Sequence, residues 1–279
     1  MEKRTTKSKG ENNEKVMSFW EHLEELRGHI IRSLIAVVIL AIVAFLNRHL
    51  VFDTIILAPS TSHFITYQLL CELGNFIHAP SLCIKGVNLK IININLSGQF
   101  LMHMYISAVV GVIVAFPYVL WEIWRFVTPA MYSKEKKYSR GGLFFSTFLF
   151  LTGVVFSYFF IVPIMVNFLG SYSVSADVVN QITLNSYIST MTSMLFAVGI
   201  VFELPILVYF LTRIGIVTPH FLKASRKYMV VILLTVAAII TPPDVFSQML
   251  VFIPLEILYE VSILVSKRVY KKLQKRALE

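Results

Sequence analysis

Long apolar runs alternate with short polar segments along almost the whole chain. Six runs of mainly apolar residues are candidate membrane spans, and they cover residues 30–46, 100–120, 143–162, 186–211, 228–240 and 246–265. A helix needs about 20 apolar residues to cross the hydrocarbon core of a bilayer, and most of the runs are near that length. We therefore predict an all-α membrane protein with six transmembrane helices.

The last two spans are predicted to be short. The run at 228–240 would rise only about 20 Å as a helix, and the polar turn Thr241-Pro-Pro-Asp244 follows it directly. The next run carries Glu256 and Glu260, which shorten its uninterrupted apolar part. We read the pair as a tight helical hairpin that thins the local bilayer.

The positions of Lys and Arg predict the orientation of the spans. Of the 25 Lys and Arg residues, 22 lie in the segments 1–32, 121–140, 213–227 and 267–276. The opposite loops hold only Arg48, Lys85 and Lys90. Because cytoplasmic loops are enriched in these cations, both termini are predicted to be cytoplasmic.

The domain organisation follows from these spans. We expect a cytoplasmic tail over 1–18, a six-span membrane domain over 19–270 and a second cytoplasmic tail over 271–279. A polar tail precedes the first apolar run, so no cleavable signal peptide is expected. The long outer loop 51–97 holds Cys71 and Cys83, which form either a disulfide, as an oxidising compartment permits, or two unpaired thiols.

Composition narrows the function classes. Hydrophobic residues make up 56% of the chain and charged residues 15%, against about 25% charged in a soluble domain. The net charge of +9 does not indicate nucleic-acid binding, because the cations form no stripe interleaved with aromatic residues. No HExxH, GxSxG, P-loop or CxxC pattern occurs, so we expect neither an enzyme nor a metal or cofactor site.

Glu203 stands out within the apolar run 186–211. The next cation, Arg213, lies ten residues on, or roughly 15 Å along a helix. Charged side chains at this depth cost several kcal/mol and usually mark a working site. We expect Glu203 to bond to a polar neighbour such as Thr192 or to a partner helix.

The N-terminal segment predicts an amphipathic helix at the membrane surface. Apolar residues recur at helical spacing from Phe19 to Ile30, while Glu24 and Glu25 lie among the acids on the other side. Two interpretations remain open at this point. The acids form a solvated face in which Glu24 pairs with Arg27, or they form a docking patch for a cationic partner.

A second polar region follows the run at 100–120. Pro117 is expected to end or kink that span, and Phe126 is an expected interface anchor together with two nearby tryptophans. Glu122 and Glu135 are placed in the cytoplasmic loop. Glu135 either faces the N-terminal acids or balances the lysines beside it.

The turn after residue 240 is the third polar region. Asp244 is a plausible N-cap for the last helix. A short hairpin also exposes polar groups at membrane depth, which favours packing of a partner helix.

Four segments together resemble the TatC family, the multispanning receptor subunit of the twin-arginine protein translocase. They are Glu21-His-Leu-Glu-Glu-Leu-Arg27, Pro117 through Trp124-Arg-Phe-Val-Thr-Pro-Ala-Met-Tyr-Ser-Lys-Glu135, Phe202-Glu-Leu-Pro205 and Thr241-Pro-Pro-Asp-Val-Phe-Ser-Gln248. The resemblance covers residues 19–270. The sequence departs from the family pattern after Arg27, where it has Gly28-His29 and relatives often have another basic residue.

The resemblance implies roles for particular residues. It implies a signal-peptide site formed by Glu25, Arg27, Phe126, Glu135 and Glu203. It implies a concave cavity around Glu203, and contact with partner subunits at Thr241, Asp244 and Gln248.

The resemblance also implies a function. Such a protein lies in the bacterial inner membrane and binds twin-arginine signal peptides. With single-span TatA/TatB-type partner subunits it exports folded proteins, driven by the proton-motive force and without catalysis of its own. The alternative from the residues alone is a proton-coupled secondary transporter that uses Glu203, but the sequence shows no repeat relating two halves.

Overall fold

The structure, a computed structural model, describes residues 19–76, 78, 83, 86, 89–127, 136–175, 177, 180–241 and 245–277. Its main helices are α1 (Phe19–Leu46), α2 (Ile65–Phe76), α3 (Gly98–Val127), α4 (Lys136–Phe156), α5 (Val162–Ser171), α6 (Leu184–Val201), α7 (Leu204–Ile214), α8 (Pro219–Ala224), α9 (Arg226–Ile240) and α10 (Val245–Ala277). Shorter elements are η1 (Leu50–Ile56), η2 (Ala58–Ser60), η5 (Ser157–Ile161), β1 (Ile91–Ile92) and β2 (Ile182–Thr183).

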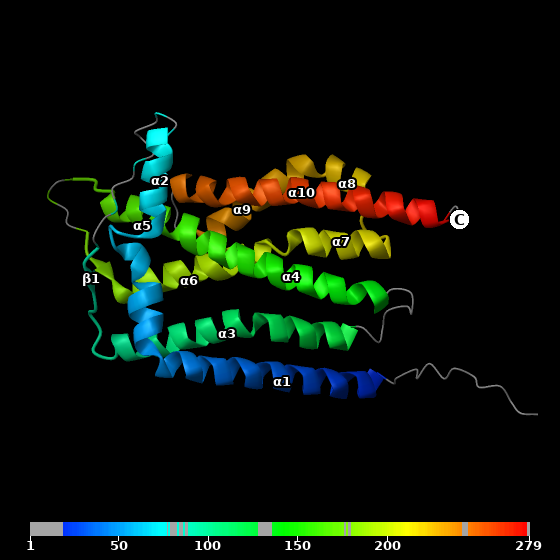
Figure 1. Ribbon diagram of the computed structural model, residues 1–279, viewed down its shortest axis with the longest axis horizontal. Coiled ribbons are helices and arrows are strands. Elements are labelled where there is room, and N and C mark those ends of the chain that lie inside the picture. The colour runs from blue at the N-terminus through cyan, green and yellow to red at the C-terminus, as the bar shows by residue number, and fades with distance from the viewer. Residues whose placement is uncertain are drawn as a thin grey trace, which may run out of the picture.

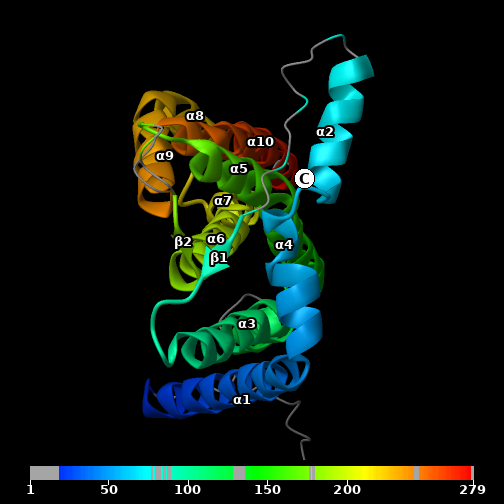
Figure 2. The same cartoon turned by 90° about the vertical axis from the view of Figure 1, so that its left-hand side faces the viewer.

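The long helices lie roughly along one axis and form a bundle. Figure 1 shows α1 and α3 side by side at one edge, α4 and α7 in the middle and α10 at the opposite edge. α2 and η1 stand across one end of this bundle (Figures 1 and 2). The start of α1 and the end of α10 lie together at the other end of the bundle.

Five stretches of helix are long and apolar enough to cross a membrane within the residues described. α9 is not among them, because it has 15 residues and rises only about 22 Å. The helix predicted over 228–240 is therefore present and short, while five rather than six helices have the length and apolar character of a span among the described residues. α10 has 33 residues, so the prediction of a short last helix is wrong: its acids interrupt the apolar pattern without interrupting the helix.

α1 packs closely along α3 because small residues meet where the two helices touch. A Cβ atom added to Gly111 of α3 would lie 2.8 Å from the backbone nitrogen of Ala41 in α1. Only glycine permits this approach, as in other tightly packed membrane helices. The other side of α1 exposes apolar residues such as Leu34 and Ile39, which suits contact with lipid.

The predicted span 186–211 is interrupted, and Glu203 lies at the interruption. α6 ends at Val201 and α7 begins at Leu204, with Pro205 in its first turn. A proline cannot donate a backbone hydrogen bond and clashes with the preceding turn, which accounts for the break. Pro117 has a milder effect than predicted, because α3 continues through it to Val127.

Tyrosine hydroxyls attach the outer segment to the bundle. Tyr158 donates to the carbonyl of Ile55 at 2.8 Å, and Tyr187 donates to that of Ile56 at 2.7 Å. Tyr67 of α2 donates to the carbonyl of Pro163 at 2.8 Å, and burial raises the pKa of Tyr67 to about 12. These bonds give hydrogen-bond partners to backbone carbonyl groups in irregular segments that the bundle covers.

Two further links order this end of the molecule. Cys71 and Cys83 form a disulfide, so the first of the two alternatives for these cysteines is confirmed. β1 pairs in parallel with β2, with Ile91 opposite Ile182. The disulfide closes a loop within the outer segment, and the strand pair connects that segment with the start of α6.

Candidate functional site

Three residues on α3 and three on α1 face one another where the two helices meet near the N-terminal end of α1. On α3 they are Tyr118, Glu122 and Phe126, which are spaced four residues apart. On α1 they are Glu25, His29 and Arg32. Residues three or four apart share one helix face, so helix geometry alone aligns each set.

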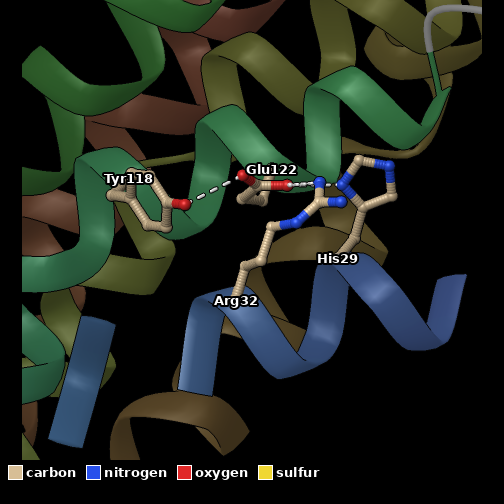
Figure 3. Close-up of polar contacts among 4 residues, drawn as sticks. All are labelled: His29, Arg32, Tyr118 and Glu122. Carbon is tan, nitrogen blue, oxygen red and sulfur yellow. Dashed lines mark hydrogen bonds and ion pairs between the residues drawn. The ribbon is translucent and has the colours of Figure 1, made fainter. Parts of the chain in front are cut away.

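Glu122 is the centre of this contact (Figure 3). Its side chain is 1% exposed. One carboxylate oxygen, Oε2, contacts Nδ1 of His29 and lies 3.7 Å from the Arg32 guanidinium. The Tyr118 hydroxyl donates to the other oxygen at 3.0 Å. Both oxygens of this buried acid are therefore engaged, as a buried charge requires.

Glu25 and Phe126 flank the His29–Glu122 pair. The ring of Phe126 meets the ring of His29 edge to face, with centroids 6.0 Å apart. Glu25 lies one turn before His29 and is half-buried. Its Oε2 atom is inaccessible and has no hydrogen-bond partner among the described residues. The structure thus leaves one acidic oxygen without a hydrogen-bond partner beside the His29–Glu122 contact.

The other residues predicted for this site divide into two groups. Arg27 is exposed on α1, so it lies outside the buried contact. Glu135 lies outside the described residues. The prediction that Glu122 belongs to a loop is wrong, because α3 extends to Val127 and buries it.

Glu203 forms a separate site at the break between α6 and α7. Ser146 of α4 donates to its Oε2 atom at 2.5 Å. Its Oε1 atom is buried without a hydrogen-bond partner among the described residues. The expected polar neighbour is therefore Ser146 and not Thr192, whose hydroxyl contacts the Tyr105 hydroxyl at 3.0 Å and donates to the carbonyl of Ile188.

An apolar groove of about 600 Å³ runs beside Glu203. It lies between α4, α7 and α10, and Phe202 and Pro205 contribute to its wall. Glu203 itself is not among the residues that line it. The expected cavity is therefore present next to the acid rather than around it.

The α9–α10 hairpin uses two of its predicted contact residues internally. The Thr241 hydroxyl donates to the carbonyl of Ala237 at 2.9 Å, which closes the end of α9. Gln248 of α10 donates to the carbonyl of Leu234 at 3.0 Å, which ties the two helices together. Asp244, the predicted N-cap, lies outside the described residues.

Sequence reasoning missed His29, Glu122 and Ser146 as site residues. The available signal was the pairing of two unusual residues: a histidine at the start of one apolar run and an acid at the end of the next. Ser146 carried no signal, because serine is common in membrane helices and its role depends only on what it faces.

Comparisons with known proteins agree over most of the chain. The family model described as Sec-independent protein translocase protein (TatC) matches residues 21–254. A Sec-independent protein translocase protein TatC from Blattabacterium sp. subsp. Periplaneta americana is 42% identical over 95% of this chain and 99% of its own length. The TatCy protein of Bacillus subtilis is 34% identical over 93% of this chain and 92% of its own length.

A solved structure agrees as well. A crystal structure of the twin arginine translocase receptor TatC in DDM matches with a TM-score of 0.71 and 34% identity. The match covers 88% of this chain and 99% of that one.

Proposed function

Since this chain belongs to the TatC family of Sec-independent protein translocase components, which is not an enzyme family, we propose that it is the receptor that binds twin-arginine signal peptides. With single-span TatA/TatB-type subunits it exports folded proteins across the bacterial inner membrane, driven by the proton-motive force. The solved relative described as a twin arginine translocase receptor supports the receptor role.

The observation that carries the proposal is the Oε2 atom of Glu25, which has no hydrogen-bond partner among the described residues. A carboxylate oxygen shielded from water and lacking a partner is unfavourable, and a guanidinium group recovers that free energy with a short charge-assisted bond. Glu122 does not compete for the peptide, because His29, Arg32 and Tyr118 already engage it. Glu25 is thus the acid in this contact that is available to an incoming arginine.

Phe126 and Glu135 complete the proposed site. Phe126 fixes the ring of His29 and gives the site an aromatic wall on which an arginine can stack. Glu135 is proposed as the acid for the second arginine. Arg27 is exposed on α1. It is proposed to face the peptide outside the pair of acids formed by Glu25 and Glu135. Glu203 is proposed to contact the apolar part of the signal peptide from the neighbouring groove.

Glu25→Ala tests the proposal against a closely matched control, Glu24→Ala. Glu24 is the adjacent acid and is exposed, so both variants remove one charge from the same turn. We expect Glu25→Ala to weaken binding of a twin-arginine peptide about ten- to hundredfold, because hydrogen bonds to charged groups contribute about 1.5–3 kcal/mol. Glu24→Ala should have little effect, and salt should weaken wild-type binding.

Peptide discrimination gives the second measurement. Wild-type protein should crosslink an Arg-Arg signal better than a Lys-Lys signal, because lysine cannot bind a carboxylate bidentately. Glu25→Ala combined with Glu135→Ala should abolish that preference while assembly with partner subunits persists. Unchanged discrimination in the double variant would place the recognition site elsewhere on this face.

The proposal includes six spans with both termini in the cytoplasm. The distribution of 22 of 25 cations to one side supports this orientation. α9, with 15 residues, crosses only if the bilayer thins around the hairpin. Cysteine placed at Asp177, after removal of the native pair, should react with an impermeant thiol reagent from outside the cell, and labelling only from the cytoplasm would refute the orientation.

The α9–α10 hairpin is the proposed contact for a partner helix. The bonds of Thr241 and Gln248 hold the turn and the register of the two helices, and Asp244 lies between them in sequence. Gln248→Leu should reduce copurification of the single-span subunits while leaving signal-peptide crosslinking intact. Undiminished copurification would separate the hairpin from partner binding.

A further inference from the structure

A second cavity lies at the opposite end of the bundle from the proposed peptide site. It has a volume of about 460 Å³. It lies where the end of α1, η1, β1 and the start of α3 come together, at the left of Figure 1. None of the contacts proposed for export uses it.

The cavity combines a cationic rim with a polar group at its inner wall. Arg48 lies at the rim, and no ion pair is found for it among the described residues. Asp53 also lines the cavity. Its Oδ2 atom lies 2.9 Å from Nδ1 of His49, so this carboxylate already has a partner. Arg48 is therefore the charge that this rim offers to a ligand.

His103 supplies the inner polar group. Its ring stacks on Phe45 with centroids 4.0 Å apart and meets Phe52 edge-on at 5.5 Å. These contacts fix the ring, while its Nε2 atom is inaccessible and has no hydrogen-bond partner among the described residues. A fixed imidazole N–H is a suitable donor to a phosphate oxygen.

The surroundings of the cavity identify the source of such a phosphate. Leu46, Leu50 and Phe100 are respectively 76%, 59% and 59% exposed beside it. The cavity also lies where the apolar runs of α1 and α3 end, which is the depth of lipid headgroups. A lipid with its acyl chains on this apolar surface and its phosphate at Arg48 would account for both the exposed apolar residues and the cation at the rim.

We propose that this cavity binds the phosphate-bearing headgroup of an anionic phospholipid in the outer leaflet. Arg48 holds the phosphate with its guanidinium, as guanidinium groups do with oxyanions. His103 donates a hydrogen bond from the inner wall. The inference rests on the proposed orientation of the spans, which puts this end of the bundle outside, and not on signal-peptide binding.

Native mass spectrometry of the full-length protein in detergent tests the proposal with phosphatidylglycerol as the probe. Arg48→Ala should weaken lipid binding about tenfold, which corresponds to about 1.4 kcal/mol. Arg48→Lys should have an intermediate effect, because lysine binds phosphate only as a point charge. Lys90→Ala is the matched control, since Lys90 is an exposed cation close to β1 that does not line the cavity.

Three results would overturn the proposal. The first is that Arg48→Ala binds phosphatidylglycerol as tightly as the wild type, and the second is that Lys90→Ala loses as much affinity as Arg48→Ala. The third is displacement of the lipid by glycerol 3-phosphate at equal concentration, which would make the site one for a free phosphate. Support would be a loss specific to Arg48 together with no such displacement.

Discussion

Glu122 and Glu203 are both acids within apolar helices, but their surroundings differ. Glu122 is held by His29, Arg32 and Tyr118, so both of its oxygens have partners. Glu203 has one bond, from Ser146, and its second oxygen is buried without a partner among the described residues. The same residue type thus occupies a complete polar network in one region and an incomplete one in the other.

The difference indicates different roles for the two acids. A satisfied buried network fixes the arrangement of the groups that form it, so Glu122 clamps α1 to α3. A buried polar group without a partner costs free energy and is retained where a function needs it. We therefore propose that Glu122 positions the two helices and that Glu203 acts in transport. The tests of this contrast are ranked by their expected effect on stability.

Glu122→Ala should have the largest effect on stability. The change leaves His29 buried without its partner, and breaking a buried ion pair by removing one member costs about 3–5 kcal/mol. The apparent melting temperature in detergent should fall sharply. Glu122→Gln, which can still accept from Tyr118, should lose less, and equal losses in the two variants would argue against a charge-based clamp.

Ser146→Ala should have an intermediate effect. It deprives Glu203 of the hydrogen bond from Ser146, and leaving a buried acceptor unsatisfied costs about 1–3 kcal/mol. The same change in a Glu203→Ala background should cost almost nothing, because the acceptor is already gone. A double-mutant cycle measured by thermal unfolding gives the coupling, and additive losses would mean that the two side chains act independently.

Glu203→Ala should have the smallest effect on stability and still impair transport. Removing an acid that is half satisfied should change the unfolding free energy by less than about 1 kcal/mol, within the range of mild substitutions. Ser146 can then donate to a carbonyl of its own helix. Export of a twin-arginine reporter should fall strongly, and Glu203→Gln should be milder. Normal export by Glu203→Ala would remove the proposed role for this acid.

Local sequence signals predicted much of the fold. The apolar runs located the helices, and the short run at 228–240 became the 15-residue helix α9. The family resemblance led to Glu25 and Phe126, which the structure places on either side of His29. In each case the prediction used a pattern confined to one segment.

Predictions failed where a residue's partner lies far away in the sequence. His29 and Glu122 are 93 positions apart, and Ser146 and Glu203 are 57 apart. Thr192 was named as an example of a polar neighbour for Glu203, yet it contacts Tyr105 of α3 instead. Nothing in the local pattern of α6 specifies which neighbouring helix supplies a hydroxyl.

The sequence by itself determined which segments enter the membrane, because the free energy of burying apolar side chains depends on local composition. It also determined the break at Glu203, because Pro205 lacks the donor that a continuous helix requires. Only the tertiary structure decided which acids are neutralised. That outcome depends on helix packing, where the close approach of Gly111 to Ala41 brings α1 against α3 and His29 within reach of Glu122, while no cation reaches Glu203 within the described part of the chain.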